Sequence, residues 1–524
     1  MLSYGLSFED LYSAAGVAKL DQIFLEHLDT STLQLASGLK AARTGPDAFT
    51  RKAESELLLE LAPHLEDFLA RLFGIEDACA ALKNEHLRLA DLYSCKRQFV
   101  QRRATARVKP EQAALIDGPA AERGLEARFG EPFSELAFAR HVTRWLADES
   151  NHVDDLAAAL SYAGWSVHTQ AGRARHGDGI LFKAPRKLDP YRLVPAAEER
   201  HEGYKTYRLG HTRRREGFEL TDRGTDLVGA LDEANYCIWC HEQGKDSCSQ
   251  GLRNKPAAGA KLGTFKKSVF GVTLAGCPLE EKISEFHKLK AAGRAIGALA
   301  MIVVDNPMLA ATGHRICNDC MKSCIYQKQD PVDIPRAETR TLKDVLELPW
   351  GFEIYSLLTR WNPLNIRRPY ALPSTGRRTL IVGMGPAGFT LAHYLLNDGH
   401  AVVGIDGLKI EPLAADISGV EPSGARVPFR PIENVHALYE SLDDRVMAGF
   451  GGVAEYGITV RWDKNFLKLI RVLLERRARF ALHGGIRFGG TLTAESAFEL
   501  GFDHIALGAG AGKPTLLDLS LIHI

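Results

Sequence analysis

The sequence lacks net charge, any long apolar run and an apolar N-terminal segment. Its 524 residues include 65 Lys and Arg and 65 Asp and Glu, so the formal net charge is zero. This balance gives no overall field that would favour nucleic acid or an anionic membrane. No stretch approaches the roughly 18 apolar residues of a membrane helix, and the early Glu9-Asp10 pair is unlike a secretory signal. We therefore expect a cytoplasmic protein with no membrane span and no bound nucleic acid.

Cysteine is scarce outside one region of the chain. Seven of the nine cysteines lie between Cys237 and Cys324, whereas Cys79 and Cys95 stand alone on helical patterns. In a reducing cytosol, closely spaced thiols favour metal binding over disulfides. The seven fall into two groups: Cys237, Cys240, Cys248 and Cys277, then Cys317, Cys320 and Cys324. Thiolates at this density are typical ligands of iron–sulfur clusters, whose sites often combine a C-x2-C run with a later Cys-Pro.

Two alternatives to iron–sulfur clusters follow from the same residues. Cys237-x2-Cys240 and Cys317-x2-Cys320 match the spacing of a four-cysteine zinc site, but a zinc site would leave three cysteines unused. Disulfides would leave one cysteine of the seven unpaired. Two four-iron clusters need eight ligands, so one place remains for another residue. We favour the iron–sulfur interpretation and keep a zinc-stabilised scaffold as its alternative.

A glycine-rich nucleotide fingerprint follows the cysteines. Residues 379–382 and 401–405 are short apolar runs that predict strands, and residues 386–397 predict a helix between them. The fingerprint joins the first strand to the helix and consists of Gly383, Met384, Gly385, Pro386, Ala387 and Gly388. Asp406 follows the second strand, 23 positions after the first glycine. This arrangement is typical of a dinucleotide-binding βαβ unit.

Each fingerprint residue has a physical role in such a unit. Gly383 permits the tight turn, Gly385 lets the backbone approach a pyrophosphate, and Gly388 lets the helix pack closely on the strand. Pro386 suits the first helical turn, whose free N–H groups face the phosphates. Asp406 would accept hydrogen bonds from a ribose hydroxyl. The motif alone does not separate FAD from NAD(P), and a βαβ unit without a ligand is the alternative.

Composition and hydrophobic spacing divide the chain into units. The predicted units are a helical domain of unknown role at 1–165, a connector or small mixed domain of short strands at 166–228, a helical two-cluster iron–sulfur domain at 229–345, a linker at 346–376, an incomplete Rossmann-like FAD-binding domain at 377–518 and a non-native tail at 519–524. The fold class is therefore multidomain, α plus α/β. A helix is predicted over 280–304, and the proline-rich stretch 331–376 predicts a connector with one short helix near 342–346.

From about Tyr236 to Pro514 the chain resembles the glutamate synthase small (beta) subunit and the similar N-terminal half of dihydropyrimidine dehydrogenase. The matching segments include Cys-Ile-Trp-Cys at 237–240, Gly-Cys-Pro-Leu at 276–279, Thr-Gly-His-Arg-Ile-Cys at 312–317, the fingerprint at 383–388, Gly-Gly-Val-Ala-Glu-Tyr-Gly-Ile at 451–458 and Ile-Ala-Leu-Gly-Ala-Gly at 505–510. The combination is specific, although no single segment is.

This resemblance implies FAD and two four-iron clusters whose ligands are exchanged between the cysteine groups. One cluster would be held by Cys237, Cys240, Cys248 and Cys324. The other would be held by Cys277, Cys317, Cys320 and Glu338, because the family supplies a Gln or Glu at the position that Glu338 matches. The alternative for Glu338 is an ordinary surface carboxylate. FAD would bind the fingerprint, and the same pocket would be lined by Gly452, Arg461, Gly508 and Ala509.

The resemblance also implies an NAD(P)H-dependent oxidoreductase. The flavin would receive a hydride and pass single electrons through the clusters to an acceptor protein or domain. The chain departs from the family in three places. The segment 249–276, which carries Lys266 and Lys267, stands where the family has a spacer of only a few residues. The segment 407–450 is longer than the corresponding segment of the family. No second fingerprint follows Gly510.

Residues 519–524 do not continue the family's pattern, so we expect a fragment that ends at about Asp518, with the NAD(P)H site in a missing C-terminal part. The alternative is a non-catalytic electron-carrier subunit whose flavin is reduced by a partner.

Overall fold

The computed structural model describes residues 2–212, 214, 216–217, 219–257, 259, 262–313, 316–457 and 462–510. Helices dominate these residues, together with one four-stranded parallel sheet and one antiparallel hairpin. The expected combination of helical and α/β parts is therefore present. Within the described part of the chain, no helix combines the length and the apolar character needed to cross a membrane. Arg461 and the predicted tail at 519–524 lie outside the described residues.

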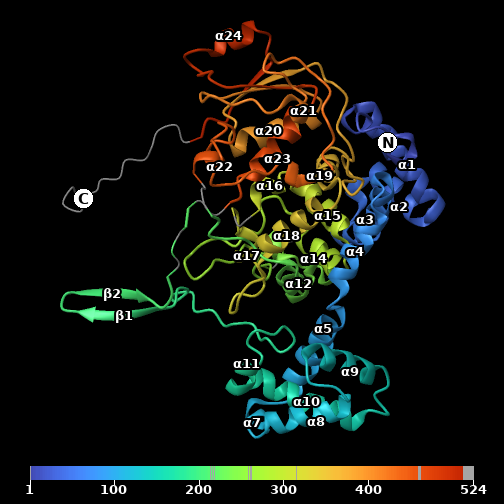
Figure 1. Ribbon diagram of the computed structural model, residues 1–524, viewed down its shortest axis with the longest axis vertical. Helices are drawn as coiled ribbons and strands as arrows, with labels where there is room; N and C mark the ends of the chain where they lie inside the picture. Colours follow the sequence, from blue (N-terminus) through green and yellow to red (C-terminus); the bar gives the residue numbers. More distant parts are fainter. Residues whose placement is uncertain are drawn as a thin grey trace.

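The first helices pack along one side of the central body (Figure 1). They are α1 (Ala14–Ser31), α2 (Leu33–Thr44), α3 (Arg51–Phe73) and α4 (Glu76–Leu87). The hydroxyl groups of Ser13 and Thr50 cap α1 and α3 by accepting backbone N–H groups of their first turns. Phe24 and Phe68 of these helices belong to the same hydrophobic cluster as the central helices and the helices beside the parallel sheet.

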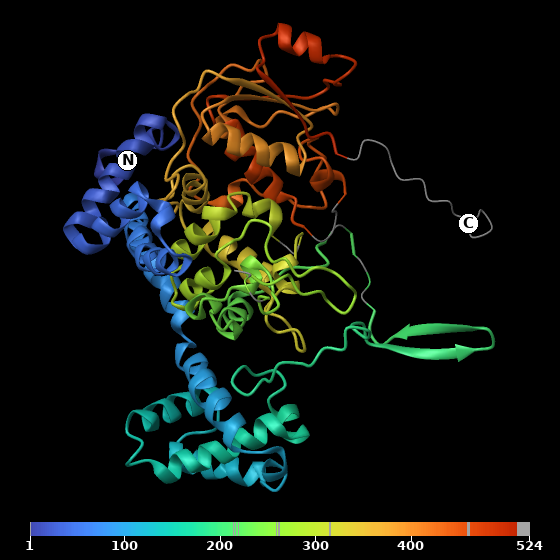
Figure 2. The same ribbon diagram turned by 180° about the vertical axis from the view of Figure 1, so that it is seen from behind.

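The next helices form a separate lobe at the lower end of the molecule (Figures 1 and 2). They are α5 (Ala90–Cys95), α6 (Thr105–Arg107), α7 (Pro110–Ala113), α8 (Gly118–Phe129), α9 (Glu135–Ala147), α10 (Val153–His168) and α11 (Gln170–Arg175), with a π-helix at Lys96–Ala104 between α5 and α6. Phe99, Phe138 and Tyr162 lie in a second hydrophobic cluster. The helical region predicted at 1–165 thus contains two cores, which helical spacing alone does not distinguish.

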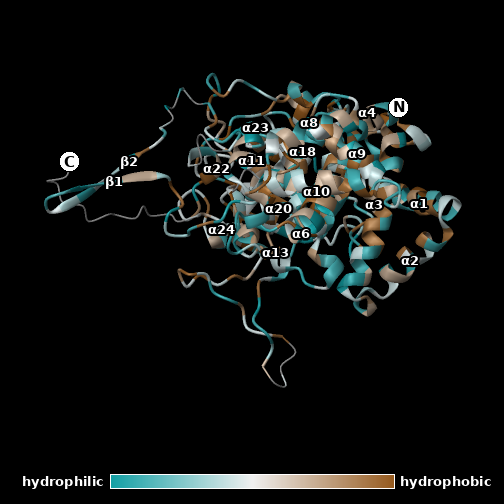
Figure 3. Ribbon diagram, turned by 90° about the horizontal axis from the view of Figure 1, so that it is seen from below, coloured by the Kyte–Doolittle hydropathy of each residue, from teal (hydrophilic) through white to brown (hydrophobic). Residues whose placement is uncertain are grey.

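A two-stranded hairpin projects from the body between the lobe and the central helices (Figures 1 and 3). Its strands are β1 (Ala196–His201) and β2 (Tyr204–Leu209), which pair antiparallel. Nearly all of its side chains are exposed. These are short strands of the kind expected within residues 166–228.

The cysteine region lies among helices at the centre of the molecule (Figure 1). They are α12 (Leu227–Tyr236), α13 (Ser247–Gln250), α14 (Ile283–Ala291), α15 (Ala295–Asp305), α16 (Leu309–Thr312), α17 (Asp319–Lys322), α18 (Ile334–Leu346) and α19 (Gly351–Leu358). The single helix predicted over 280–304 is two helices, α14 and α15. They are separated at Gly293, whose φ of +73° is a conformation that glycine adopts readily.

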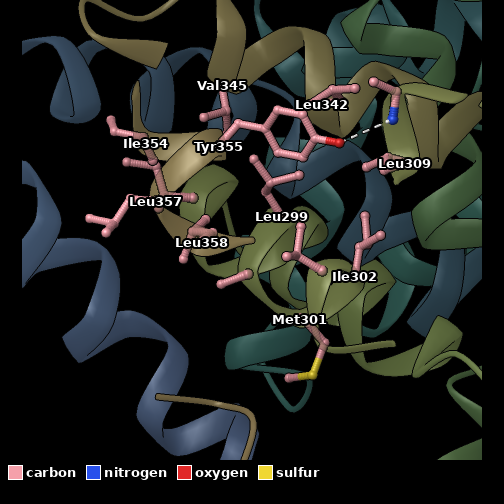
Figure 4. Close-up of a cluster of buried hydrophobic side chains, with 14 of the residues drawn as sticks. Leu299, Met301, Ile302, Leu309, Leu342, Val345, Ile354, Tyr355, Leu357 and Leu358 are labelled. Carbon is pink, nitrogen blue, oxygen red and sulfur yellow. Dashed lines mark hydrogen bonds between the residues drawn. The ribbon is translucent and has the colours of Figure 1, made fainter. Parts of the chain in front are cut away.

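Helices α15, α18 and α19 share the core shown in Figure 4. There the Tyr355 hydroxyl accepts the Ala310 N–H at 3.3 Å and donates to the Pro307 carbonyl at 2.8 Å. The short helix predicted near 342–346 is present as the end of the longer helix α18, but the connector predicted around it is wrong because it also contains the start of α18 and all of α19. Pro335 falls in the first turn of α18, where a helix does not need its missing N–H, so this proline does not interrupt it.

The C-terminal part is a parallel sheet in the order β5-β4-β3-β6. Its strands are β3 (Arg378–Val382), β4 (Ala401–Ile405), β5 (Phe480–His483) and β6 (His504–Leu507). Its helices are α20 (Pro386–Asn397), α21 (Ala415–Ser418), α22 (Val453–Tyr456), α23 (Asn465–Glu475) and α24 (Ala494–Glu499). The strands predicted at 379–382 and 401–405 and the helix predicted at 386–397 are confirmed.

Candidate functional site

The fingerprint occupies the turn between β3 and α20. Gly383 has a φ of +92°, which L side chains rarely adopt, and its N–H donates to the Ile405 carbonyl at 2.7 Å. A side chain at Gly388 would collide with the Gly383 carbonyl oxygen. These two glycines are therefore required by the turn itself and by the close packing of the helix on the strand.

The N-terminus of α20 has no capping side chain, and glycines from two later segments of the chain lie near the fingerprint. Gly385 is the N-cap residue without a capping side chain, and Pro386 and Ala387 in the first turn are exposed. A Cβ atom on Gly452 would lie 3.0 Å from the Gly385 Cα, and the Gly508 N–H donates to the Val382 carbonyl at 2.8 Å. Free N–H groups at such a helix end attract anions.

Asp406 and Ala509 complete the described part of this region. The Asp406 carboxylate accepts the Met384 N–H at 3.1 Å and the Leu408 N–H at 3.0 Å, so it holds the fingerprint loop. Each carboxylate oxygen has a second acceptor site, which leaves capacity for a ribose hydroxyl. Ala509 lies beside Gly383, 3.0 Å from the position of a Cβ atom there. The predicted nucleotide residues, Arg461 aside, thus lie around one turn.

Four of the seven cysteines line one small cavity between loops of the central helices. Cys237 follows α12, Cys240 begins the next turn, Cys248 lies on α13, and Cys324 follows α17. All four are buried. Trp239, between the first two, has a φ of +52°, so this loop holds a non-glycine residue in the left-handed region. We call these four cysteines the first set.

The thiols of the first set differ in acidity. A hydrogen bond from the Cys248 thiol and N–H groups of the following backbone lower the pKa of Cys324 to about 7, although burial opposes this. Burial raises the pKa of Cys240 to about 11 and raises the pKa of Cys237 as well. Without a cation the cavity therefore favours one thiolate beside three thiols. Metal ligation would displace the remaining protons.

The other three cysteines face two buried carboxyl groups. Burial raises the pKa of Cys277 and of Cys320, and the negative charges of Glu338 and Cys317 raise both pKa values further. Cys317 is exposed, whereas Cys277 and Cys320 are half-buried. We call these three cysteines and Glu338 the second set.

Glu338 lies on α18 and is only 6% exposed, so it is not a surface carboxylate. It accepts a hydrogen bond from the Asn306 amide at 2.9 Å, and burial raises its pKa to about 7. Glu281 is buried beside it, and the pKa of Glu281 is raised by burial and then by the charge of Glu338. Two carboxyl groups in one dry site cannot both ionise without a cation nearby.

The arrangement bears on the choice of metal. Among the described residues, no three His, Cys, Asp or Glu side chains converge on the position of a single metal ion. The zinc hypothesis pairs Cys237 and Cys240 with Cys317 and Cys320, but the cavity groups the first pair with Cys248 and Cys324. A four-iron cluster has a different requirement, because each thiolate binds its own iron. Four buried cysteines around one cavity fit that requirement.

Sequence reasoning missed Glu281 and His287. Glu281 is buried four residues after Cys277, and His287 on α14 lines the cavity of the first set. The sequence contained a signal for His287. This histidine lies one helical turn after Ile283, on the predicted apolar stripe, and a polar side chain on a buried stripe needs a hydrogen-bond partner.

Comparisons with known proteins give a family and distant relatives. Residues 2–74 match the family model described as the RP005 N-terminal alpha-helical domain. The chain is 31% identical over 298 residues to uncharacterized protein RP005 of Rickettsia prowazekii, which covers 55% of this chain and 98% of RP005. It is 52% identical over 212 residues to uncharacterized protein RP006 of the same organism, covering 40% of this chain and 28% of RP006.

A more distant similarity points to an oxidoreductase subunit. The chain is 26% identical over 202 residues to the glutamate synthase [NADPH] small chain of Mycobacterium tuberculosis, covering 36% of this chain and 38% of that protein. The chain thus spans well under half the length of RP006 and of the glutamate synthase subunit. It spans nearly all of RP005. The chain belongs to the RP005 family.

Proposed function

We propose that this chain is the electron-transfer module of an NAD(P)H-dependent oxidoreductase that uses FAD and two four-iron clusters. The observation that carries the proposal is the cavity lined by four buried cysteines, in the same molecule as an open glycine fingerprint. The distant similarity to a glutamate synthase [NADPH] small chain supports it. The final acceptor in this proposal is a partner protein or domain.

The two sets of residues would hold the two clusters. The cysteines of the first set would hold one cluster, and Cys277, Cys317, Cys320 and Glu338 would hold the other. When bound, the flavin converts a hydride into single electrons and the clusters carry these onward. The surrounding chain buries the four cysteines of the first set and supplies backbone N–H groups to Cys324.

The fingerprint would hold the flavin nucleotide through its backbone. The open N-terminus of α20 would receive the pyrophosphate, and Asp406 would bind a ribose hydroxyl while it holds the loop. Gly452, Gly508 and Ala509 leave the approach to this turn free of bulky side chains. No general base is needed, because this chain positions redox groups and does not itself move a substrate proton.

Anaerobic reconstitution with FAD, iron and sulfide tests this proposal. We expect flavin binding and a brown chromophore, followed by bleaching of both on addition of dithionite. Bleaching by NADH or NADPH is expected of a longer protein that carries the nicotinamide site. The Gly388→Ala variant should lose flavin but keep its iron, because the new methyl group collides with the Gly383 carbonyl. If the longer protein is also bleached by dithionite alone and by neither NADH nor NADPH, the carrier subunit, whose flavin is reduced by a partner, is favoured. Wild-type protein that binds neither flavin nor iron would contradict the proposal.

A further inference from the structure

His287 is a fully buried histidine with unused hydrogen-bonding capacity. It lies on α14, has 0% exposure and lines the same cavity as the four cysteines of the first set. Neither of its ring nitrogens has a hydrogen-bond partner among the described residues. Native proteins satisfy nearly all of their buried polar groups, so an orphaned imidazole points to a partner that binds in the cavity.

The other polar side chains that line this cavity are already engaged. The Ser284 hydroxyl lies 2.6 Å from Nδ1 of His241, and the Asp246 carboxylate accepts the Ser249 N–H. The Tyr326 hydroxyl donates to the Tyr236 carbonyl. Among the described residues that line this cavity, and apart from the cysteines, His287 is therefore the polar side chain whose N–H donor is unused.

The imidazole of His287 carries at least one N–H donor in either protonation state. A neutral ring carries one N–H donor and one acceptor nitrogen. Among the residues that the structure describes, no cysteine sulfur accepts a hydrogen bond from His287, so the acceptor would be supplied when the cysteines bind a group in the cavity.

We propose that His287 is a positioning residue of the first cluster and donates its ring N–H to a cluster sulfur, either a cysteine thiolate or an inorganic sulfide. This inference rests on the proposed function, because it needs a cluster in the cavity. A hydrogen bond to sulfur stabilises the additional negative charge of the reduced cluster and so raises its reduction potential. His287 thus makes the first cluster a better electron acceptor than it would be without this donor.

Redox titration of three reconstituted variants tests the inference. The Leu variant (His287→Leu) removes the donor, and the Gln variant (His287→Gln) keeps an N–H group. The control is His393→Leu, which removes a buried histidine of α20 in the nucleotide-binding part. We expect the Leu variant to bind iron and sulfide, with its one-electron reduction equilibrium about tenfold less favourable, equivalent to ~59 mV. The Gln variant should recover most of this shift, and the control should show none.

A spectroscopic measurement of the hydrogen bond itself complements the redox titration. The reduced wild-type cluster should show a magnetic coupling to the nitrogen of ¹⁵N-labelled histidine rings, and this coupling should be absent from the Gln variant. If the Leu variant does not fold, the Gln variant and this coupling still decide the question. Unchanged potentials in all loaded variants, or a coupling that persists in the Gln variant, would overturn the inference and leave the proposed function standing. Wild-type protein that takes up no cluster would instead overturn both.

Discussion

The two cysteine sets differ in how completely the fold encloses them. The first set is buried around one apolar cavity, and its most acidic thiol, Cys324, already receives hydrogen bonds. The second set includes the exposed Cys317 and depends on Glu338, a carboxylate from α18. A closed site protects a bound group from water and chelators, whereas an open one exchanges it. For the two clusters proposed above, the comparison therefore predicts a more stable first cluster and a more labile second cluster.

Removing one ligand from the enclosed site should have the largest effect. The Cys324→Ala variant should lose the first cluster, so that iron falls from about eight to about four atoms per chain. Elemental analysis after anaerobic reconstitution measures this change. The control is Cys95→Ala, because Cys95 is buried in the core of the separate helical lobe. Equal iron in both variants would contradict the assignment of Cys324.

The carboxylate ligand should matter only to the second set. The Glu338→Ala variant should lose between one and four iron atoms while the signal of the first cluster remains, because α18 no longer supplies the fourth ligand. Iron analysis together with electron paramagnetic resonance of the reduced protein separates the two clusters. Glu347→Ala is the matched control, since Glu347 follows α18 and is exposed. Loss of the first cluster in Glu338→Ala would break the distinction between the sets.

The two clusters should also differ in their rates of loss. On addition of a water-soluble iron chelator without oxygen, we expect two phases of iron release of equal size, the faster from the second set. Exposure of Cys317 gives the chelator access there, whereas all four cysteines of the first set are buried. The Cys324→Ala variant should show the fast phase alone. A single phase in the wild-type protein would show that enclosure does not control lability.

The smallest expected effect concerns the scaffold of the first set without its cluster. Glu233, on α12 ahead of Cys237, accepts the Asp333 N–H at 2.8 Å, and burial raises its pKa to about 7 from 4.5. The folded state therefore keeps a proton that the unfolded chain loses, and the free energy of unfolding falls as pH rises from about 4.5 to 7. For this group the loss is at most about 3 kcal/mol.

The Glu233→Gln variant should remove this part of the pH dependence. Its amide oxygen can still accept the Asp333 N–H, but the side chain no longer titrates. Urea unfolding of the cluster-free protein between pH 5 and pH 8 measures the difference. We expect a shallower slope for the variant than for the wild-type protein. Parallel slopes would show that Glu233 does not hold its proton in the folded state.

The sequence predicted local features of the fold better than its packing. The strands and helix around the fingerprint were correct, because Gly383, Pro386 and Gly399 mark the turn, the helix start and the helix end by local backbone preference. Only the end of α18 was predicted and α19 was missed, because prolines near helix starts look like those of a connector. The roles of Glu281 and His287 depend on contacts between distant segments, which local spacing does not encode.

The most direct test of the account is the iron and acid-labile sulfide content of protein purified without oxygen. The account predicts about eight iron atoms and eight sulfides per chain, with the brown absorption of four-iron clusters. A colourless protein without iron, or one that contains stoichiometric zinc and no sulfide, would contradict it.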